Sequence, residues 1–127
     1  MDNLLDTHTF LWYIEGNANL SENAKKLIEN PGVINYISIA SFWEISIKSS
    51  LNKIELKVPF PGLAYYISFN KFQLLPIAFE DTLIVSALPL YHRDPFDRII
   101  IAQAMHRNLR LLSKDELFGS YNISLSW

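Results

Sequence analysis

The sequence contains no cysteine. Disulfide bonds, iron–sulfur clusters, cysteine-ligated zinc and thiol catalysis are therefore excluded. The sequence also lacks an excess of positive charge, because 11 Lys and Arg against 13 Asp and Glu give a formal net charge of −2. A generally basic surface, which is common among nucleic-acid-binding domains, is thus not expected.

Long hydrophobic runs are absent as well. The most apolar run, residues 99–102, is soon interrupted by Gln103 and His106, whereas a membrane-spanning helix needs about 18 or more apolar residues. No basic residue precedes the first apolar pair, so the N-terminus does not resemble a secretory signal. We therefore expect a soluble, cytoplasmic protein.

Apolar and aromatic side chains are plentiful. Hydrophobic residues make up 50% of the 127 residues and aromatic residues 13%, which is incompatible with a disordered chain. A chain of this length is expected to form a single domain over residues 1–127 and to bury about two thirds of its unfolded surface. Some of the remaining apolar surface is expected to lie against a partner.

Short apolar runs alternate with stretches of helical periodicity along the chain. Such alternation argues for an α/β sandwich with a mainly parallel sheet. The predicted strands cover residues 4–5, 33–37, 74–77 and 110–112, and the predicted helices cover residues 8–15, 22–28, 40–51, 63–69, 81–88 and 95–107.

Five acidic residues are candidates for function. Ligands of parallel sheets bind outside the carboxyl ends of the strands, and both Asp6 and Asp115 follow a predicted strand. An isolated carboxylate at such a strand end is costly without a hydrogen bond or a cation. The other candidates are Glu44, in the third predicted helix, and Asp94 with Asp97, at the start of the last one.

These acids also have a structural alternative as helix caps. Residues 94–97, Asp-Pro-Phe-Asp, are typical of a helix start, with an acid at the N-cap, proline at N1 and a second acid near the positive end of the helix dipole. Ser41 with Glu44, and Ser113 with Glu116, have the spacing of a capping box. Capping alone would leave these residues without a chemical role.

The capping explanation is weaker where an acid lies on an apolar helix face. Glu44 shares its predicted face with Ala40 and Ile47, so its carboxylate is expected to point toward the core and to need a partner. Lys48, four residues further on, is one structural partner that could neutralise it. Asp97 likewise shares its face with apolar residues of its own helix.

Several carboxylates brought together would repel one another and raise their own pKa values unless a cation neutralises them. A hard divalent cation such as Mg²⁺ prefers oxygen ligands, and Mn²⁺ is expected to substitute for it. An all-carboxylate site without His or Cys ligands therefore favours phosphoryl-group chemistry over zinc-dependent hydrolysis.

Four blocks of sequence occur over nearly the whole chain: LLDTH at 4–8, SIASFWEI at 38–45, HRDPFDR at 92–98 with IAQA at 101–104, and LLSKD at 111–115. Together they resemble the PIN domain of VapC-type toxins, in the family's order. The tryptophan–glutamate pair and the Asp-Pro-Phe-Asp-Arg run are the most specific parts.

The resemblance implies a three-layer α/β/α PIN-like sandwich with a short central, mainly parallel sheet. It also implies a Mg²⁺-dependent endoribonuclease that a cognate antitoxin protein holds in check. Asp6, Glu44 and Asp97 match the family's core metal-binding acids, and Asp115 matches its more variable fourth acid. In the expected mechanism Asp6 and Asp97 hold Mg²⁺ directly, Glu44 and Asp115 act through water or a second ion, and an activated water attacks the RNA phosphodiester.

Two further positions support this expected site. Thr7 follows the first acid and either holds a water or phosphate oxygen or caps the first helix. Asp94 is expected mainly to cap the last helix and so to position Asp97, with direct metal ligation as the alternative.

Basic and aromatic residues are candidates for contact with RNA. Arg93, Arg98 and Lys114 are expected to contact phosphate or else to pair with nearby acids. His92 is expected to be an exposed loop histidine rather than a catalytic one, because metal-dependent hydrolysis does not require an imidazole. Aromatic residues that could stack on bases, or could equally belong to the core or an interface, are Trp12, Trp43, Tyr65 and Tyr66.

Two other functions remain open from the sequence. One is a receiver-like phosphoacceptor domain, which shares the length, the α/β layers and a Mg²⁺-binding acidic pocket. The other is a non-catalytic interaction module in which the acids only cap helices. The apolar content is compatible with a homodimer as well as with a bound antitoxin. If four of the 13 acids surround a metal, 13 − 4 = 9 acids remain against 11 basic residues, so the rest of the molecule carries 11 − 9 = +2.

Overall fold

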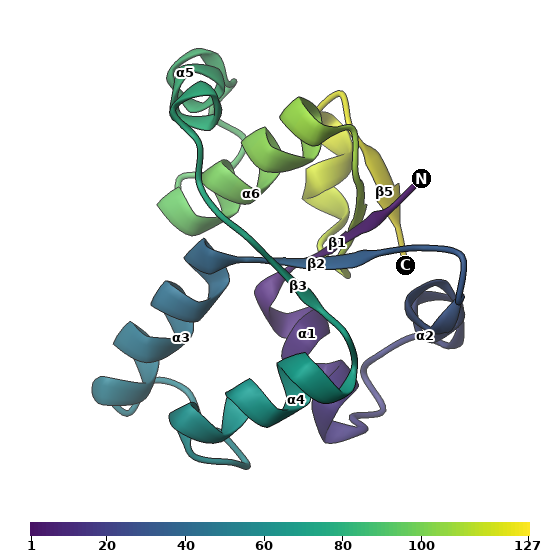
Figure 1. Cartoon of the computed structure of the whole chain (residues 1–127). Coiled ribbons are helices and arrows are strands. Elements are labelled where there is room, and N and C mark those ends of the chain that lie inside the picture. The colour runs from purple at the N-terminus through teal and green to yellow at the C-terminus, as the bar shows by residue number, and fades with distance from the viewer.

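Five short strands form one sheet in the computed structural model, which describes residues 1–127 (Figure 1). Helices lie on both sides of it. The strands are β1 (Asn3–Leu5), β2 (Asn35–Ser38), β3 (Gln73–Leu75), β4 (Arg110–Leu112) and β5 (Ser124–Ser126). The helices are α1 (Thr7–Glu15), α2 (Glu22–Glu29), α3 (Ile39–Ser50), α4 (Leu63–Phe69), α5 (Phe79–Ala87) and α6 (Pro95–Arg107), with 3₁₀ turns η1 (Phe60–Gly62) and η2 (Glu116–Ser120).

The strand order is β3-β2-β1-β4-β5, and every neighbouring pair is parallel. The central strand β1 pairs with both β2 and β4, so that Leu4 lies opposite Tyr36 on one side and Leu111 on the other. Receiver domains have the order 2-1-3-4-5. The receiver-like alternative is therefore wrong for this chain.

Alternate residues of each strand point to opposite faces of the sheet, which gives the domain two cores. Leu5, Ile37 and Leu112 face α1 to α4 and pack with Phe10. Residues on the other face, such as Leu111, pack against α6 and η2. The expected three-layer α/β/α architecture is confirmed, and the sheet is entirely rather than mainly parallel.

Side-chain caps begin most of the helices. Ser21 caps α2, and Asp94 caps α6 with Pro95 in the first turn, as the sequence predicts for Asp94. The two predicted capping boxes are wrong. Ser38 caps α3, which places Ser41 inside that helix, and Asp115 caps η2, which places Glu116 in its first turn.

The main difference between prediction and structure lies at the edges of the sheet. Strand β5 was not predicted, because its three residues, Ser-Leu-Ser, have no apolar run and the strand is stabilised only by pairing with β4. Strand β3 ends at Leu75, just before a proline, whereas the sequence pattern extends it to Ile77. No helix is both long enough and apolar enough to cross a lipid bilayer.

Candidate active site

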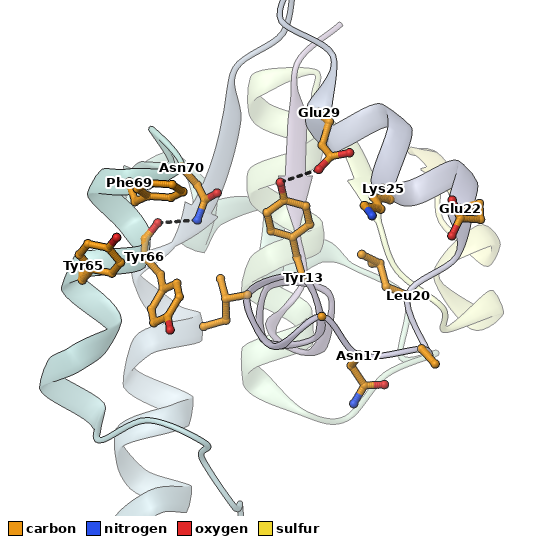
Figure 2. Close-up of a pocket in the computed structure, with 13 residues that line it drawn as sticks. Tyr13, Asn17, Leu20, Glu22, Lys25, Glu29, Tyr65, Tyr66, Phe69 and Asn70 are labelled. Carbon is orange, nitrogen blue, oxygen red and sulfur yellow. Dashed lines mark hydrogen bonds between the residues drawn. The ribbon is translucent and has the colours of Figure 1, made fainter.

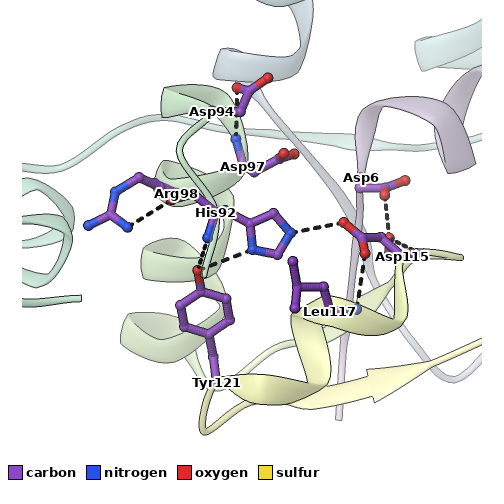
Figure 3. Close-up of polar contacts among 9 residues, drawn as sticks. Asp6, His92, Asp94, Asp97, Arg98, Asp115, Leu117 and Tyr121 are labelled. Carbon is purple, nitrogen blue, oxygen red and sulfur yellow. Dashed lines mark hydrogen bonds and ion pairs between the residues drawn. The ribbon is translucent and has the colours of Figure 1, made fainter. Parts of the chain in front are cut away.

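Acidic residues gather around the carboxyl edge of the sheet (Figure 3). Asp6 directly follows β1, and Asp115 follows β4 after two intervening residues. Glu44 is in the second turn of α3, which continues directly from β2. Because parallel strands end at the same edge of a sheet, residues far apart in sequence meet there. Asp97 reaches this edge from the first turn of α6.

Asp6 is a partly buried N-cap whose two carboxylate oxygens both accept hydrogen bonds. Its Oδ1 accepts hydrogen bonds from the backbone N–H of Thr9 at 2.8 Å and from the Thr9 hydroxyl at 2.6 Å. Its Oδ2 accepts from the hydroxyl of Ser113. Burial nevertheless raises the pKa of Asp6 above its ordinary value, against the lowering effect of these hydrogen bonds. The structure thus assigns the capping role to Asp6 rather than to Thr7.

Glu44 lies in a small polar network on the inner side of α3. Its side chain is buried, and its Oε1 accepts a hydrogen bond of 2.7 Å from the Thr7 hydroxyl. The ammonium group of Lys48 donates to the other oxygen, which raises the pKa of Lys48. Negative charge on Asp94 and Asp97 raises it further. The predicted ion pair between Glu44 and Lys48 is therefore confirmed, and Lys48 is a cation next to three acids.

Asp97 differs from its acidic neighbours because its carboxylate accepts no hydrogen bond from the protein. Burial and then the charge of Asp94 raise its pKa from 3.8 to about 7, with smaller contributions from Glu44 and Asp6, while His92 opposes the shift. A carboxylate with this pKa is electrostatically unsatisfied in its charged form. The negative charges of Asp94, Glu44 and Asp6 all raise the pKa of Asp97.

Asp94 has the capping geometry that its sequence predicts. Its Oδ1 accepts from the backbone N–H of Phe96 at 2.8 Å and, more weakly, from that of Asp97 at 3.4 Å. The cap fixes the first turn of α6 and therefore the direction of Asp97. Nothing in this geometry requires Asp94 to ligate a metal.

Asp115 is joined to the other acids by hydrogen bonds. Its backbone N–H donates to Ser113 Oγ at 3.1 Å, and the same hydroxyl donates to Asp6. His92 Nε2 lies 2.9 Å from Asp115 Oδ2. His92 is buried rather than exposed, so the sequence-based expectation for it is wrong. Two of these residues, His92 and Ser113, had not been predicted to organise the acids, although both lie inside the blocks that carry the family resemblance.

The three predicted phosphate-contacting residues differ in their surroundings. The guanidinium group of Arg98 donates to the carbonyl oxygens of Val85, Leu88, Pro89 and His92 at 2.9–3.2 Å, so it holds the loop after α5 and is not available to RNA. This corrects the prediction for Arg98. Arg93 and Lys114 are exposed, and Lys114 Nζ lies 5.8 Å from the ring centroid of Trp12.

The acidic residues fit a hard divalent cation by their chemistry, although no three of them stand ready to coordinate one ion together. The donors are oxygens only, and the pKa of Asp97 is raised although Lys48 lies near it. Mg²⁺ keeps several waters and is commonly held by one or two carboxylates, which does not require a tight cage. Asp97 and Asp6 are the residues whose raised pKa values such a cation would lower.

A separate groove, which none of the five candidate acids lines, is shown in Figure 2. It has a volume of about 690 Å³ and runs between α1, α2 and α4. Tyr65 and Phe69 line it and are 62% and 69% exposed. Tyr13 donates a hydrogen bond of 3.2 Å to Glu29 at the rim, and burial with the Glu29 charge raises the pKa of Tyr13. Aromatic residues are thus available to a partner here. Tyr66 also lines the groove. The other two candidates do not: Trp12 packs against Trp127, and Trp43, which is 62% exposed, packs against Phe96 in the first turn of α6.

A three-layer α/β/α fold with acids around the carboxyl edge of a parallel sheet is the arrangement of a PIN domain. The chain belongs to the PIN domain family, whose model matches residues 4–123. PIN domains are nuclease-type domains that generally depend on divalent metal ions.

Solved structures with a similar fold include a chain of a toxin–antitoxin complex from Klebsiella pneumoniae, which is 17% identical, with a TM-score of 0.67 over 99% of this chain and 97% of that one. A chain of VapBC2 from Rickettsia felis bound to a promoter DNA fragment is 17% identical, with a TM-score of 0.71 over 99% of this chain and 98% of that one. A chain of DNA-bound VapBC from Salmonella typhimurium is also 17% identical, with a TM-score of 0.68 over 99% and 97%. For FitAcB from Neisseria gonorrhoeae the values are 16%, 0.67, 97% and 95%. No curated protein matches the sequence.

Proposed function

We propose that the protein is a Mg²⁺-dependent endoribonuclease and acts as the toxin of a type II toxin–antitoxin pair. The observation that carries the proposal is Asp97, a carboxylate in a PIN fold whose pKa is raised to about 7 by burial and by Asp94, Glu44 and Asp6. Such a site is unfavourable in the protein alone, and a cation would make it favourable. Isolated helix caps, the non-catalytic alternative, would not need to share one charged neighbourhood.

In the proposed mechanism each acid has a distinct task. Asp6 and Asp97 would hold the cation, and Glu44 and Asp115 would complete the acidic pocket through water. The chemistry that Mg²⁺ supplies when bound is activation of a water and stabilisation of charge on the leaving oxygen. Thr7 holds Glu44 in place by its 2.7 Å hydrogen bond, and Asp94 fixes the turn that carries Asp97. Exposed Arg93 and Lys114 would contact phosphates on either side.

The experiment is cleavage of a structured RNA by the purified protein with Mg²⁺, Mn²⁺ or EDTA. Cleavage is expected with either metal, no cleavage with EDTA, and a loss of about 100-fold or more in Asp6→Asn and Asp97→Asn. Glu55→Gln, which removes an exposed acid in the loop after α3, is the matched control and should cleave like the wild type. Cleavage by the wild type that persists in EDTA would eliminate the metal mechanism.

An antitoxin partner is proposed because structural neighbours of this chain are the VapBC and toxin–antitoxin complexes. The groove between α1, α2 and α4 is the concave, aromatic surface that best suits an antitoxin segment. Tyr65→Ser with Phe69→Ser is expected to abolish co-purification with the antitoxin encoded beside the gene while leaving RNA cleavage intact. Unchanged co-purification would place the antitoxin elsewhere.

A homodimer is proposed separately. Large apolar side chains are exposed on and around α5, on the far side of the sheet from the groove, with Phe79 72% and Leu83 54% exposed. A second copy that presents the same face would cover them. Solution mass measured for the protein alone tests this, and Phe79→Ser is expected to shift the mass to that of a monomer. A monomeric wild type would contradict it.

A further inference from the structure

We propose that His92 is a positioning residue that fixes the carboxylate of Asp115 for the acidic pocket, with Tyr121 fixing the orientation of the imidazole. The inference rests on the proposed function, which assigns Asp115 to that pocket. It concerns a residue that the sequence predicts to be an exposed loop histidine and that the structure buries.

The imidazole of His92 lies between Tyr121 and Asp115 (Figure 3). Its ring is stacked on Phe118, with centroids 4.4 Å apart and planes 15° from parallel. Its backbone N–H donates to the Tyr121 hydroxyl at 2.8 Å, and its Nδ1 lies 3.1 Å from the same oxygen. Its Nε2 is 2.9 Å from Asp115 Oδ2. The imidazole therefore has one orientation, and its free end points at Asp115.

The hydrogen-bond network determines which nitrogen carries the hydrogen. The partner of Nε2 is a carboxylate oxygen of Asp115, which can only accept, so Nε2 is the nitrogen that carries a hydrogen toward it. In a neutral imidazole Nδ1 is then an acceptor, and the Tyr121 hydroxyl, whose oxygen already accepts from the backbone N–H of His92, can donate its hydrogen to Nδ1. The Tyr121 hydroxyl thus favours the tautomer that can hold the carboxylate.

The backbone of His92 is fixed from a third direction. Arg98, in the first turn of α6, donates to the carbonyl oxygen of His92 at 3.1 Å and to three other carbonyls of the segment before it. The loop that contains His92 is therefore hydrogen-bonded to α6, the helix that contains Asp97. The position of Asp115 is coupled in this way to that of Asp97.

A second histidine–aspartate pair differs from the first in which partner is buried. His106 Nδ1 lies 2.8 Å from Asp81 Oδ1, and there the aspartate side chain is 1% exposed and the histidine 32%. A buried polar group needs such a partner for its own stability. In the first pair the exposures are reversed, with His92 at 6% and Asp115 at 45%. The pair therefore satisfies the buried imidazole and gives the exposed carboxylate of Asp115, which has water available and needs no partner, one orientation.

The carboxylate of Asp115 can accept further hydrogen bonds while His92 holds it. One of its oxygens, Oδ1, accepts the 3.0 Å hydrogen bond from Leu117 that caps η2, and the other accepts from His92. Each carboxylate oxygen can accept a second hydrogen bond or bind a cation. The outward side of both oxygens is therefore free for a metal-bound water, which is the role that the proposed function gives to Asp115.

Three variants and one control test the inference. His92→Phe keeps a ring on Phe118 and removes the donor, whereas His92→Gln keeps an N–H donor near the position of Nε2. Tyr121→Phe keeps the packing and removes the hydroxyl that favours the tautomer. His106→Phe is the matched control, because it removes a histidine–aspartate hydrogen bond that lies outside the acidic pocket. All four are compared at equal folded fractions, from thermal melts.

Loss of the donor should affect turnover and metal binding rather than RNA binding. For His92→Phe we expect kcat to fall about 10- to 100-fold, the Kd for Mn²⁺ to rise about 10-fold and KM for RNA to stay within about threefold. His92→Gln should recover most of both losses, and Tyr121→Phe should lie between the two. His106→Phe should lower the melting temperature without changing kcat or the Mn²⁺ affinity.

A measurement on the wild type alone separates this inference from the proposed function. ¹⁵N NMR of the His92 ring is expected to show hydrogen on Nε2 and an acceptor at Nδ1, and hydrogen on Nδ1 alone would overturn the positioning role. Unchanged kcat and Mn²⁺ affinity in His92→Phe, or a His92→Gln variant as defective as His92→Phe, would also overturn it. A wild type that neither binds Mn²⁺ nor cleaves RNA would instead overturn the proposed function.

Discussion

The amino and carboxyl ends of the parallel sheet differ in the polar groups that gather there: neutral amides at one end and acids at the other. At the amino end the side chain of Asn3 donates to Asn35 Oδ1 at 2.8 Å and to the carbonyl of Leu27 at 3.0 Å, and Asn35 donates to the carbonyl of Ile28 at 2.7 Å. These neutral amides satisfy one another and the last turn of α2. At the carboxyl end, acids with the same charge are brought together instead.

Under the proposed function, the amino end of the sheet serves stability and the carboxyl end serves chemistry. A closed network of amides tolerates burial because each polar group has a partner. Asp97 accepts no hydrogen bond from the protein, and burial together with the neighbouring acids raises its pKa to about 7. A protein retains such an arrangement where a ligand compensates for it. The following predictions test this contrast, beginning with the largest expected effect.

Breaking the amide network should destabilise the fold without affecting chemistry. Asn35→Ala removes a buried donor and acceptor and leaves Asn3 and the carbonyl of Ile28 unsatisfied. We expect the free energy of unfolding to fall by about 3 kcal/mol, with RNA cleavage per folded molecule unchanged. Denaturant unfolding measures the first and a cleavage assay the second. Asn122→Ala, at an exposed residue, should change neither. A loss of cleavage per folded molecule in Asn35→Ala would contradict the view that the amide network affects stability alone.

Removing the charge of Asp97 should stabilise the fold and abolish cleavage, which is the reverse of the effect expected for Asn35→Ala. Because the pKa of Asp97 is raised to about 7 in the folded protein, the folded state binds the proton more tightly, and the stability of the wild type should fall as pH rises from about 4 to 7. Asp97→Asn removes this penalty. We expect it to be more stable than the wild type by about 1–2 kcal/mol at pH 8, allowing for solvent screening, and equally stable near pH 4.

Thermal melts from pH 4 to pH 8 measure this difference, which corresponds to a few degrees in the melting temperature. Glu55→Gln, at an exposed acid, should follow the wild type at every pH. A difference between wild type and Asp97→Asn that does not grow with pH would show that the charge of Asp97 carries no penalty. The same variant should have lost cleavage, so stability and activity would change in opposite directions.

A divalent cation should stabilise the protein only through the acids at the carboxyl end of the sheet. At a Mn²⁺ concentration of ten times its Kd, binding adds about 1.4 kcal/mol to the stability of the wild type. Asn35→Ala should gain the same amount, because its acids are intact, whereas Asp97→Asn should gain much less. Melting temperatures with and without Mn²⁺ at pH 7.5 make the comparison. An equal gain in all three proteins would place the ion elsewhere.

Charge near the acids should have the smallest effect. Lys114 lies between Ser113 and Asp115 in the chain and is exposed, so Lys114→Gln is expected to weaken RNA binding by about threefold and to reduce the slope of log K against log salt by about 1. Lys26→Gln, at an exposed lysine on α2, is the control and should leave the slope unchanged. Equal effects of the two would mean that RNA follows overall charge rather than its distribution.

Local features were predictable from the sequence. The helix α6 was predicted with its observed bounds, because an acid, a proline and an apolar periodicity mark its start and course. The burial of Glu44 and its pairing with Lys48 follow from helical spacing. The position of Asp6 after a strand follows from a short apolar run.

Features that depend on distant partners were not predictable from local pattern. His92 is buried because Phe118 and Tyr121, more than 25 residues further along the chain, pack on its ring. Arg98 was predicted to contact phosphate, but carbonyl oxygens at the end of α5 surround its guanidinium group. In each case the sequence around the residue is compatible with an exposed side chain, and only packing decides against it.

The sequence by itself therefore determined the alternation of strands and helices, the parallel sheet, the acids and the family resemblance. These depend on residue type and on spacing along a single element. Tertiary structure alone decided that Asp94, Glu44 and Asp6 act on the pKa of Asp97, and that His92 holds Asp115. Electrostatic and hydrogen-bonding energies depend on distance in space and on burial, and for residues as far apart in sequence as 6 and 115 only the folded sheet sets either one.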